Sequence, residues 1–144
     1  MTATLDTNVL LYASDESSSF HDRAIGLLQT IAAGPDLVYL FWPVLLSYVR
    51  IATHPTIFRK PLSAVDAMGN VDDLLTRPHV RTSSEADGFW AVYRQVASAT
   101  PARGNLVPDA HIVALMRQHG VSTIWSHDRD FLKFAGVTVR DPFA

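Results

Sequence analysis

Apolar and polar residues alternate along the chain in two patterns, and each pattern predicts one kind of element. Short continuous apolar runs are typical of strands that are covered on both faces. Between these runs, apolar residues recur every three or four positions, as on the buried side of a helix. The runs predict strands over 3–5, 37–41, 80–82, 123–126 and 137–140; the spaced residues predict helices over 20–33, 43–53, 63–75 and 108–119, one from a cap at Ser83 or Ser84 to Ala99, and one that begins within 9–13.

The alternation of these strands and helices predicts the fold class. Parallel strands need long crossovers, usually helices, so the order indicates an α/β fold with a mostly parallel central sheet. The length of 144 residues suits one domain over 1–144. Ligands of such sheets bind beyond the carboxyl ends of the strands, so we expect the functional residues there.

Composition narrows the class of protein further. Hydrophobic residues make up 48% and charged residues 18%, which favours a folded protein over a disordered one. The chain has no cysteine, which excludes disulfides and thiolate metal sites. No apolar run reaches the ~18 residues of a membrane span, so we expect no membrane association and a cytoplasmic location. The net charge of −2 gives no indication of a nucleic-acid partner. The type of basic residue says more, because ten of the twelve are Arg, which binds phosphate in a bidentate manner.

Four aspartates fall where the predicted elements meet the expected ligand edge. Asp6 follows the first strand, Asp109 begins a late helix, and Asp128 and Asp130 follow the strand ending in "STIW". Carboxylates that converge raise each other's pKa, and a hard divalent cation removes that repulsion. Each acid also has a simpler interpretation, because Asp6, Asp109 and Asp128 are all placed to cap a helix or turn.

Three segments carry a resemblance to a known family. The segments "LDTNVLLYA", "LVPDAHIVALMRQHG" and "IWSHDRDF" resemble the best-marked motifs of the PIN-domain nucleases, and most of all the VapC-type toxins of bacterial toxin–antitoxin pairs. Two further segments, "YVRIATHPTIF" and "VTVRDPF", are also similar to this family. The resemblance extends over 4–143, and the order and spacing of the motifs make it specific.

The resemblance implies a PIN-like three-layer α/β/α fold and a metal-dependent endoribonuclease. Mg²⁺, or Mn²⁺ in its place, would bind Asp6, Asp109 and Asp128, which are the implied catalytic residues. The implied substrate is a structured RNA such as transfer or ribosomal RNA. The implied supporting residues around the acids are Asp130, Asn8 and Ser126.

One position departs from the family pattern. Many members carry Glu three residues before the arginine of the third helix, and here that position is Ser47, in "LLSYVR". Serine supplies no negative charge, so the centre would bind metal more weakly or keep more water ligands. Asp130 would offset part of this loss. The alternative is a catalytically weakened PIN domain that binds RNA or a protein without cutting.

The resemblance also implies partners. RNA would contact exposed arginines, with Arg103, Arg129 and Arg50 as candidates, although Arg50 would equally pair with an acid or with the antitoxin's terminal carboxylate. The implied protein partners are a VapB-like antitoxin and a second copy of the chain. The helices over 43–53 and 63–75 hold more apolar residues than one buried face needs, and this surplus would line such contacts or simply add to the core.

A third hypothesis belongs to another class. An α/β domain with clustered aspartates is also typical of phosphoacceptor proteins, which need a lysine beside the pocket. Lys133 is the one candidate, and its spacing from the acids in sequence is unfavourable.

Overall fold

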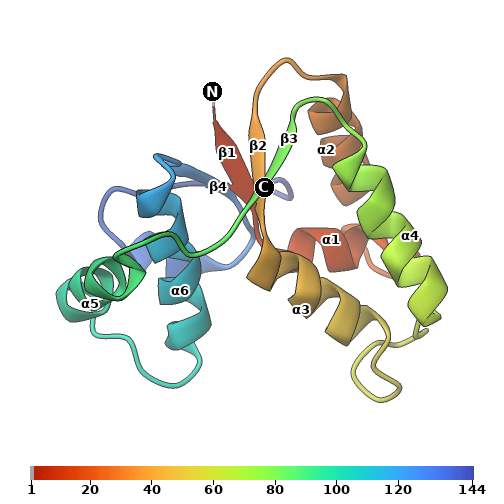
Figure 1. Cartoon of the computed structure of the whole chain (residues 1–144). Coiled ribbons are helices and arrows are strands. Elements are labelled where there is room, and N and C mark those ends of the chain that lie inside the picture. Colours follow the sequence, from red (N-terminus) through yellow and green to blue (C-terminus); the bar gives the residue numbers. More distant parts are fainter. Residues whose placement is uncertain (1) are drawn as a thin grey trace.

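The computed structural model describes residues 2–144, which form a five-stranded parallel sheet with helices on both sides (Figure 1). The strand order is β3-β2-β1-β4-β5, and all four neighbouring pairs are parallel. The predicted three-layer α/β/α fold is confirmed, and the sheet is parallel throughout. The strands are β1 (Ala3–Leu5), β2 (Val38–Phe41), β3 (Val80–Ser83), β4 (Thr123–Trp125) and β5 (Thr138–Arg140).

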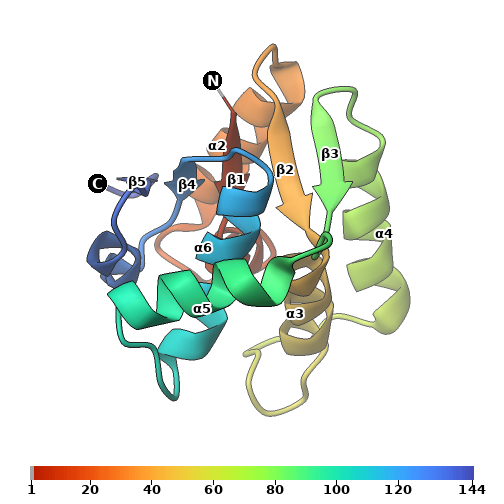
Figure 2. The ribbon, with the colours of Figure 1, turned by 60° about the vertical axis from the view of Figure 1, so that its left-hand side comes forward.

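The helices divide between the two faces of the sheet. α1, α2 and α4 lie on one side, with α3 packed against α1 and α4, while α5 and α6 pack together on the other side (Figure 2). No helix within residues 2–144 is long and apolar enough to cross a membrane. The helices are α1 (Thr7–Ala13), α2 (His21–Ala33), α3 (Trp42–Ala52), α4 (Ala64–Leu75), α5 (Phe89–Ala99), α6 (Leu106–Gln118) and the short 3₁₀ helix η1 (Arg129–Lys133).

The core surrounds the central strand. All three residues of β1 are buried, because helices cover both of its faces. The buried Thr4 hydroxyl donates to Tyr39 O on β2 at 2.6 Å, which satisfies a polar group inside the sheet. On the other face, α6 contributes Val113 and Ala114, both fully buried. A rigid sheet therefore fixes the ends of β1 and β4, where the acids begin.

Three helix starts differ from the sequence-based prediction. The helix expected to begin within 9–13 begins at Thr7, because Asp6 is already its N-cap. The helix predicted from Ser83 or Ser84 begins only at Phe89, because the segment before it is held by a different partner. The Gln118 amide of α6 accepts from Ala86 N at 2.9 Å and donates to Ala86 O at 3.2 Å, so these backbone groups need no helical bonds. α6 begins at Leu106 instead of Pro108; proline is tolerated in a first turn, where its missing N–H has no helical acceptor.

Candidate active site

The ends of two parallel neighbours place the predicted acids at one edge of the sheet. Asp6 directly follows β1, and Ser126 directly follows β4. The strands pair with Leu5 opposite Trp125, and the Asp6 backbone N–H continues the ladder by donating to Trp125 O at 3.0 Å. The segment that carries Asp128 therefore leaves the sheet beside Asp6.

Three carboxylates form a close group at this edge. Asp109, Asp128 and Asp130 each offer an oxygen, and these oxygens all lie within 4.8 Å of one another. Asp109 lies in the first turn of α6, while Asp128 caps η1 by accepting from Asp130 N at 2.8 Å. The capping interpretation and the cluster interpretation thus both hold for Asp128. We define Asp109, Asp128 and Asp130 as the acid group.

The membership of this group differs from the sequence-based expectation. Asp130 was expected in a supporting place, and the 3₁₀ turn brings its carboxylate among the three closest. Asp6, which is expected within the metal-binding set, is not among these three carboxylates, and its role as a metal ligand stays a prediction. Its negative charge still acts on Asp109. The four acids therefore face one region, with Asp6 at its buried side.

Ser126 connects Asp6 to the acid group. Its side chain is buried, with 1% exposed, and its hydroxyl donates to Asp6 Oδ2 at 2.9 Å. The same oxygen accepts the backbone N–H of Asp128 at 2.9 Å. One hydroxyl therefore fixes both the Asp6 carboxylate and the start of the loop that carries Asp128, which is the positioning expected of a residue behind a metal ligand.

The acids raise one another's pKa. Burial, and then the charges of Asp128, Asp6 and Asp130, raise the pKa of Asp109 from 3.8 to about 7, while Lys133 acts in the opposite direction. Burial and the charge of Asp128 also raise the pKa of Asp6, against the hydrogen bond from Ser126 and the backbone amides of Thr7 and Asn8. Without a cation, burial and the neighbouring negative charges therefore keep the Asp109 carboxyl protonated up to a pH of about 7.

The residues fit a hard divalent cation. Carboxylate oxygens are the ligands that Mg²⁺ and Mn²⁺ prefer, and the acid group supplies three of them within 4.8 Å. The raised pKa of Asp109 indicates excess negative charge at this place, which a bound cation would neutralise instead of the proton. The acid group would hold the metal, with Asp6 close by.

The remaining predicted residues differ in their exposure and in the groups that they contact. The Asn8 side chain is exposed, and this residue acts on Asp6 through its backbone N–H. Ser47 is half-buried on α3, one turn beyond Val44, whose carbonyl oxygen accepts from the Thr7 hydroxyl at 3.4 Å. This contact places the first half of α3 beside the start of α1. The side chains of the three predicted RNA-binding residues, Arg103, Arg129 and Arg50, are exposed.

Lys133 lies at the acid group, although the sequence suggested it only as the lysine of a phosphoacceptor pocket. Its Nζ lies 3.0 Å from Asp130 Oδ1, and its charge reaches Asp109. The unfavourable sequence spacing was misleading, because η1 brings residues three apart onto one side of the turn. The signal was present as a basic residue three positions after Asp130.

The carboxyl-terminal segment braces the loop of the acid group. His127 Nδ1 lies 2.8 Å from Asp141 Oδ2, so the imidazole pairs with the carboxyl-terminal segment. The Phe143 ring stacks on Phe20 with centroids 4.5 Å apart, and Arg23 donates to Phe143 O. The chain end is therefore joined to the start of α2 and to the residue beside Asp128.

Replacing Ser126 with Ala is expected to lower the affinity for Mn²⁺ about tenfold. The change removes the donor to Asp6 and the acceptor for Asp128 N, and positioning residues of this kind typically contribute 10- to 100-fold. Mn²⁺ titration followed by electron paramagnetic resonance measures the change. Ser126→Thr keeps the hydroxyl and serves as the control; equal affinity of Ser126→Ala and the unchanged protein would contradict this role.

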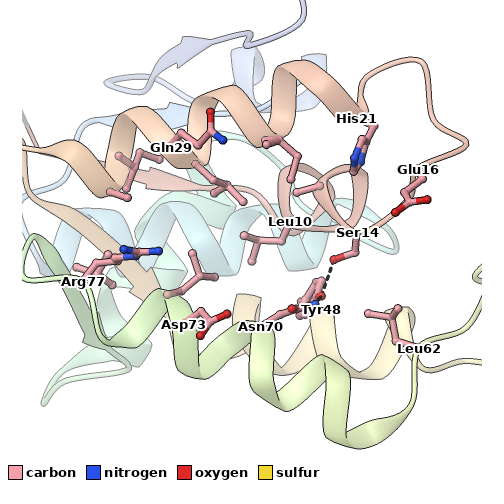
Figure 3. A pocket seen from close by; sticks show the side chains of 17 residues that line it. Leu10, Ser14, Glu16, His21, Gln29, Tyr48, Leu62, Asn70, Asp73 and Arg77 are labelled. Carbon is pink, nitrogen blue, oxygen red and sulfur yellow. Dashed lines mark hydrogen bonds between the residues drawn. The ribbon is translucent and has the colours of Figure 1, made fainter.

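A separate cavity of about 470 Å³ lies among the helices of the opposite side, from α1 to α4 (Figure 3). Its wall is apolar at Leu10, Leu28 and Leu74. The Tyr48 hydroxyl at its floor contacts Ser14 Oγ at 2.6 Å and accepts from Asn70 Nδ2 at 2.9 Å. Charged side chains also line it, among them Glu16, Asp73 and Arg77. The cavity and the acid group have no lining residue in common.

Known proteins share both the sequence and the fold. The family model described as PIN domain matches residues 3–137. Ribonuclease VapC48 of Mycobacterium tuberculosis is 56% identical over 144 residues, which cover 100% of this chain and 99% of that protein. Ribonuclease VapC43 of the same organism is 33% identical over 138 residues, covering 96% of this chain and 93% of the relative.

Two solved structures share the fold at lower identity. VapBC2 from Rickettsia felis, bound to a DNA fragment from its promoter, superposes with a TM-score of 0.71 at 14% identity and covers 97% of this chain and 98% of its own. VapC20 of Mycobacterium tuberculosis, described as a Sarcin-Ricin loop cleaving toxin, gives a TM-score of 0.65 at 22% identity, covering 94% and 98%. From the family match and the identity over the full length, we conclude that this chain belongs to the PIN-domain family and, within it, to the VapC ribonucleases.

Proposed function

We propose that this chain is a divalent-metal-dependent endoribonuclease and the toxin of a toxin–antitoxin pair. The observation that carries the proposal is the acid group, in which three carboxylates lie within 4.8 Å of one another beyond the carboxyl ends of β1 and β4. Relatives that match nearly the whole chain are named ribonucleases, and this supports RNA as the substrate. Mg²⁺ is the proposed ion, with Mn²⁺ as a substitute.

The residues of the chain prepare this centre for hydrolysis. A divalent ion, when bound, supplies activation of water and offsets charge on the phosphoryl group. Asp109, Asp128 and Asp130 would hold the ion through their carboxylate oxygens, and Asp109 would have to be ionised to do so. Ser126 holds Asp6 and Asp128 in register. Because His127 is turned toward Asp141, we assign it no part in proton transfer.

A structured RNA is the proposed target. VapC20, which shares the fold, is described as cleaving the Sarcin-Ricin loop, and this supports a structured RNA as the class of substrate. Arg103 lies on the exposed loop before α6, and Arg129 lies between Asp128 and Asp130. These positions support both as residues that would bind phosphates flanking the cut, and Arg50 on α3 is the third candidate.

An antitoxin and a second copy of the chain are the proposed protein partners. Solved relatives include VapBC toxin–antitoxin complexes, which supports a VapB-like antitoxin here. The cavity from α1 to α4 offers an apolar wall with charged residues, a lining that suits an amphipathic segment. Leu46, Val65 and Met68 are exposed on α3 and α4, and we propose that they contribute to a homodimer.

The alternative function follows from Ser47. Without the acid that many family members have there, the chain would be a weakened nuclease that binds RNA or a protein. The two functions differ in one experiment: purified chain is incubated with total RNA with and without Mg²⁺ or Mn²⁺, beside Asp6→Asn. Fragments that require the metal and are lost in Asp6→Asn support the nuclease. Intact RNA with every metal, despite binding, supports the binding module.

A further inference from the structure

The Lys133 ammonium lies at the acid group, although nothing in the fold requires a cation there. Its Nζ is 3.0 Å from Asp130 Oδ1. Both side chains are largely solvent-accessible, with 58% exposed for Lys133 and 47% for Asp130. Exposed ion pairs contribute little to folding stability, so the pair is poorly explained as a structural contact. Because Asp130 belongs to the acid group, the position of the Lys133 ammonium indicates a function at that group.

The charges at this centre leave room for one more positive group. Four ionised aspartates carry four negative charges, and one divalent ion cancels two of them. An RNA phosphate adds a further negative charge as it approaches. A centre of this kind therefore needs additional positive charge close to the reacting phosphate.

The chain offers few donors for a second divalent ion. One carboxylate oxygen of Asp130 already accepts from Lys133. The third helix carries Ser47 where many members of the family carry Glu. Asp6 is engaged by Ser126 through Oδ2. These contacts reduce the oxygens that are left for a second ion, while an ammonium supplies charge without needing a coordination shell.

We propose that Lys133 takes the place of a second metal ion: Asp130 holds its ammonium at the edge of the acid group, and the ammonium contacts a non-bridging oxygen of the scissile phosphate when RNA binds. The inference rests on the proposed nuclease function and extends it. It makes Lys133 a catalytic residue, and it sets the stoichiometry at one divalent ion per chain.

Two measurements on Lys133→Met test the proposal, and they move in opposite directions. In the absence of RNA, Mn²⁺ titration followed by electron paramagnetic resonance is expected to show affinity about threefold to tenfold higher than in the unchanged chain, because a neighbouring positive charge is gone. With Mn²⁺ at saturation, the rate of RNA cleavage is expected to fall about tenfold or more, because the contact with phosphate is lost. Lys133→Arg keeps the charge and is expected to retain most of the activity.

Lys60→Met is the matched control, since Lys60 is the other lysine of the chain and lies in the exposed loop between α3 and α4. This variant is expected to bind Mn²⁺ as the unchanged chain does. Equal Mn²⁺ affinity of Lys133→Met and Lys60→Met, or two Mn²⁺ ions in the unchanged chain, would overturn the inference. A large drop in the melting temperature of Lys133→Met would assign the pair a structural role instead.

The controls also separate this inference from the proposed function. If the unchanged chain binds Mn²⁺ and cuts RNA while Lys133→Met does both equally well, only the role of Lys133 is wrong. If the unchanged chain neither binds Mn²⁺ nor cuts RNA, the nuclease proposal fails, and the role of Lys133 fails with it.

Discussion

Replacing Asp109 with Asn is expected to reduce metal-dependent RNA cleavage by about 100-fold or more, while it stabilises the metal-free protein. The substitution keeps the shape of the side chain and removes one of the three carboxylates within 4.8 Å of one another. The loss of a charged ligand weakens the metal site, and the stabilisation of the transition state falls with it. Cleavage of total RNA and Mn²⁺ titration, each compared with the unchanged chain, measure the effect.

Asp109→Asn is expected to raise the stability of the metal-free chain although it lowers RNA cleavage, and the reason for the gain is electrostatic. The pKa of Asp109 is raised from 3.8 to about 7 by burial and by the neighbouring carboxylates. The folded state therefore binds the proton more tightly than the unfolded state, and this contribution to stability is complete below pH 3.8 and lost as the pH rises through about 7. At pH 8 the metal-free chain carries the full cost of ionising Asp109, which Asn does not have.

The expected size of that gain is modest, because Asp109 is only half-buried and solvent screens its charge. After allowance for screening, we expect about 1–2 kcal/mol, or a rise in melting temperature of about 3–8 °C at pH 8 that shrinks toward pH 4. Asp87→Asn, on an exposed loop, is the control and should leave the melting temperature nearly unchanged. A lower melting temperature of Asp109→Asn than of the unchanged chain at pH 8 would contradict the view that repulsion among these acids destabilises the metal-free chain.

The convergence of distant acids could be predicted because it follows from the topology. Asp6 and Asp128 lie 122 positions apart, yet each follows a strand of a parallel sheet, and parallel strands end at one edge. Asp109 lies in the first turn of α6, where the fold returns the chain to that edge. The fold class was equally accessible, because alternating strand and helix patterns leave few arrangements other than a parallel sheet with helices on both faces.

The short-range geometry could not be predicted, because it depends on turns and on partners from other elements. The 3₁₀ turn of η1 moves Asp130 into the acid group and folds Lys133 back onto it. The late start of α5 depends on Gln118, which lies 32 residues after Ala86. The first case depends on a local turn and the second on a tertiary contact, and in both the sequence alone leaves the local conformations equivalent.

The affinity of the RNA-free chain for Mn²⁺ is expected to rise about 100-fold between pH 5 and pH 8.5, with most of the rise below pH 7 and a plateau above it. The proton on Asp109, whose pKa is raised to about 7, competes with the cation for the same carboxylate. Below that pKa, lowering the pH by one unit removes about nine-tenths of the ionised form of Asp109, so the apparent affinity falls about tenfold. Mn²⁺ titrations at constant ionic strength from pH 5 to pH 8.5 measure the profile.

The pH profile of RNA cleavage distinguishes this competition from the titration of another group. The charged residues that act on Asp109 are Asp128, Asp6, Asp130 and Lys133. At low Mn²⁺ concentration, cleavage should follow the binding profile and break near pH 7. At higher concentration the cation displaces the proton, so the break should move to lower pH, by about one unit for each tenfold increase. A break that stays at one pH at every Mn²⁺ concentration would assign the titration to a residue outside the metal site.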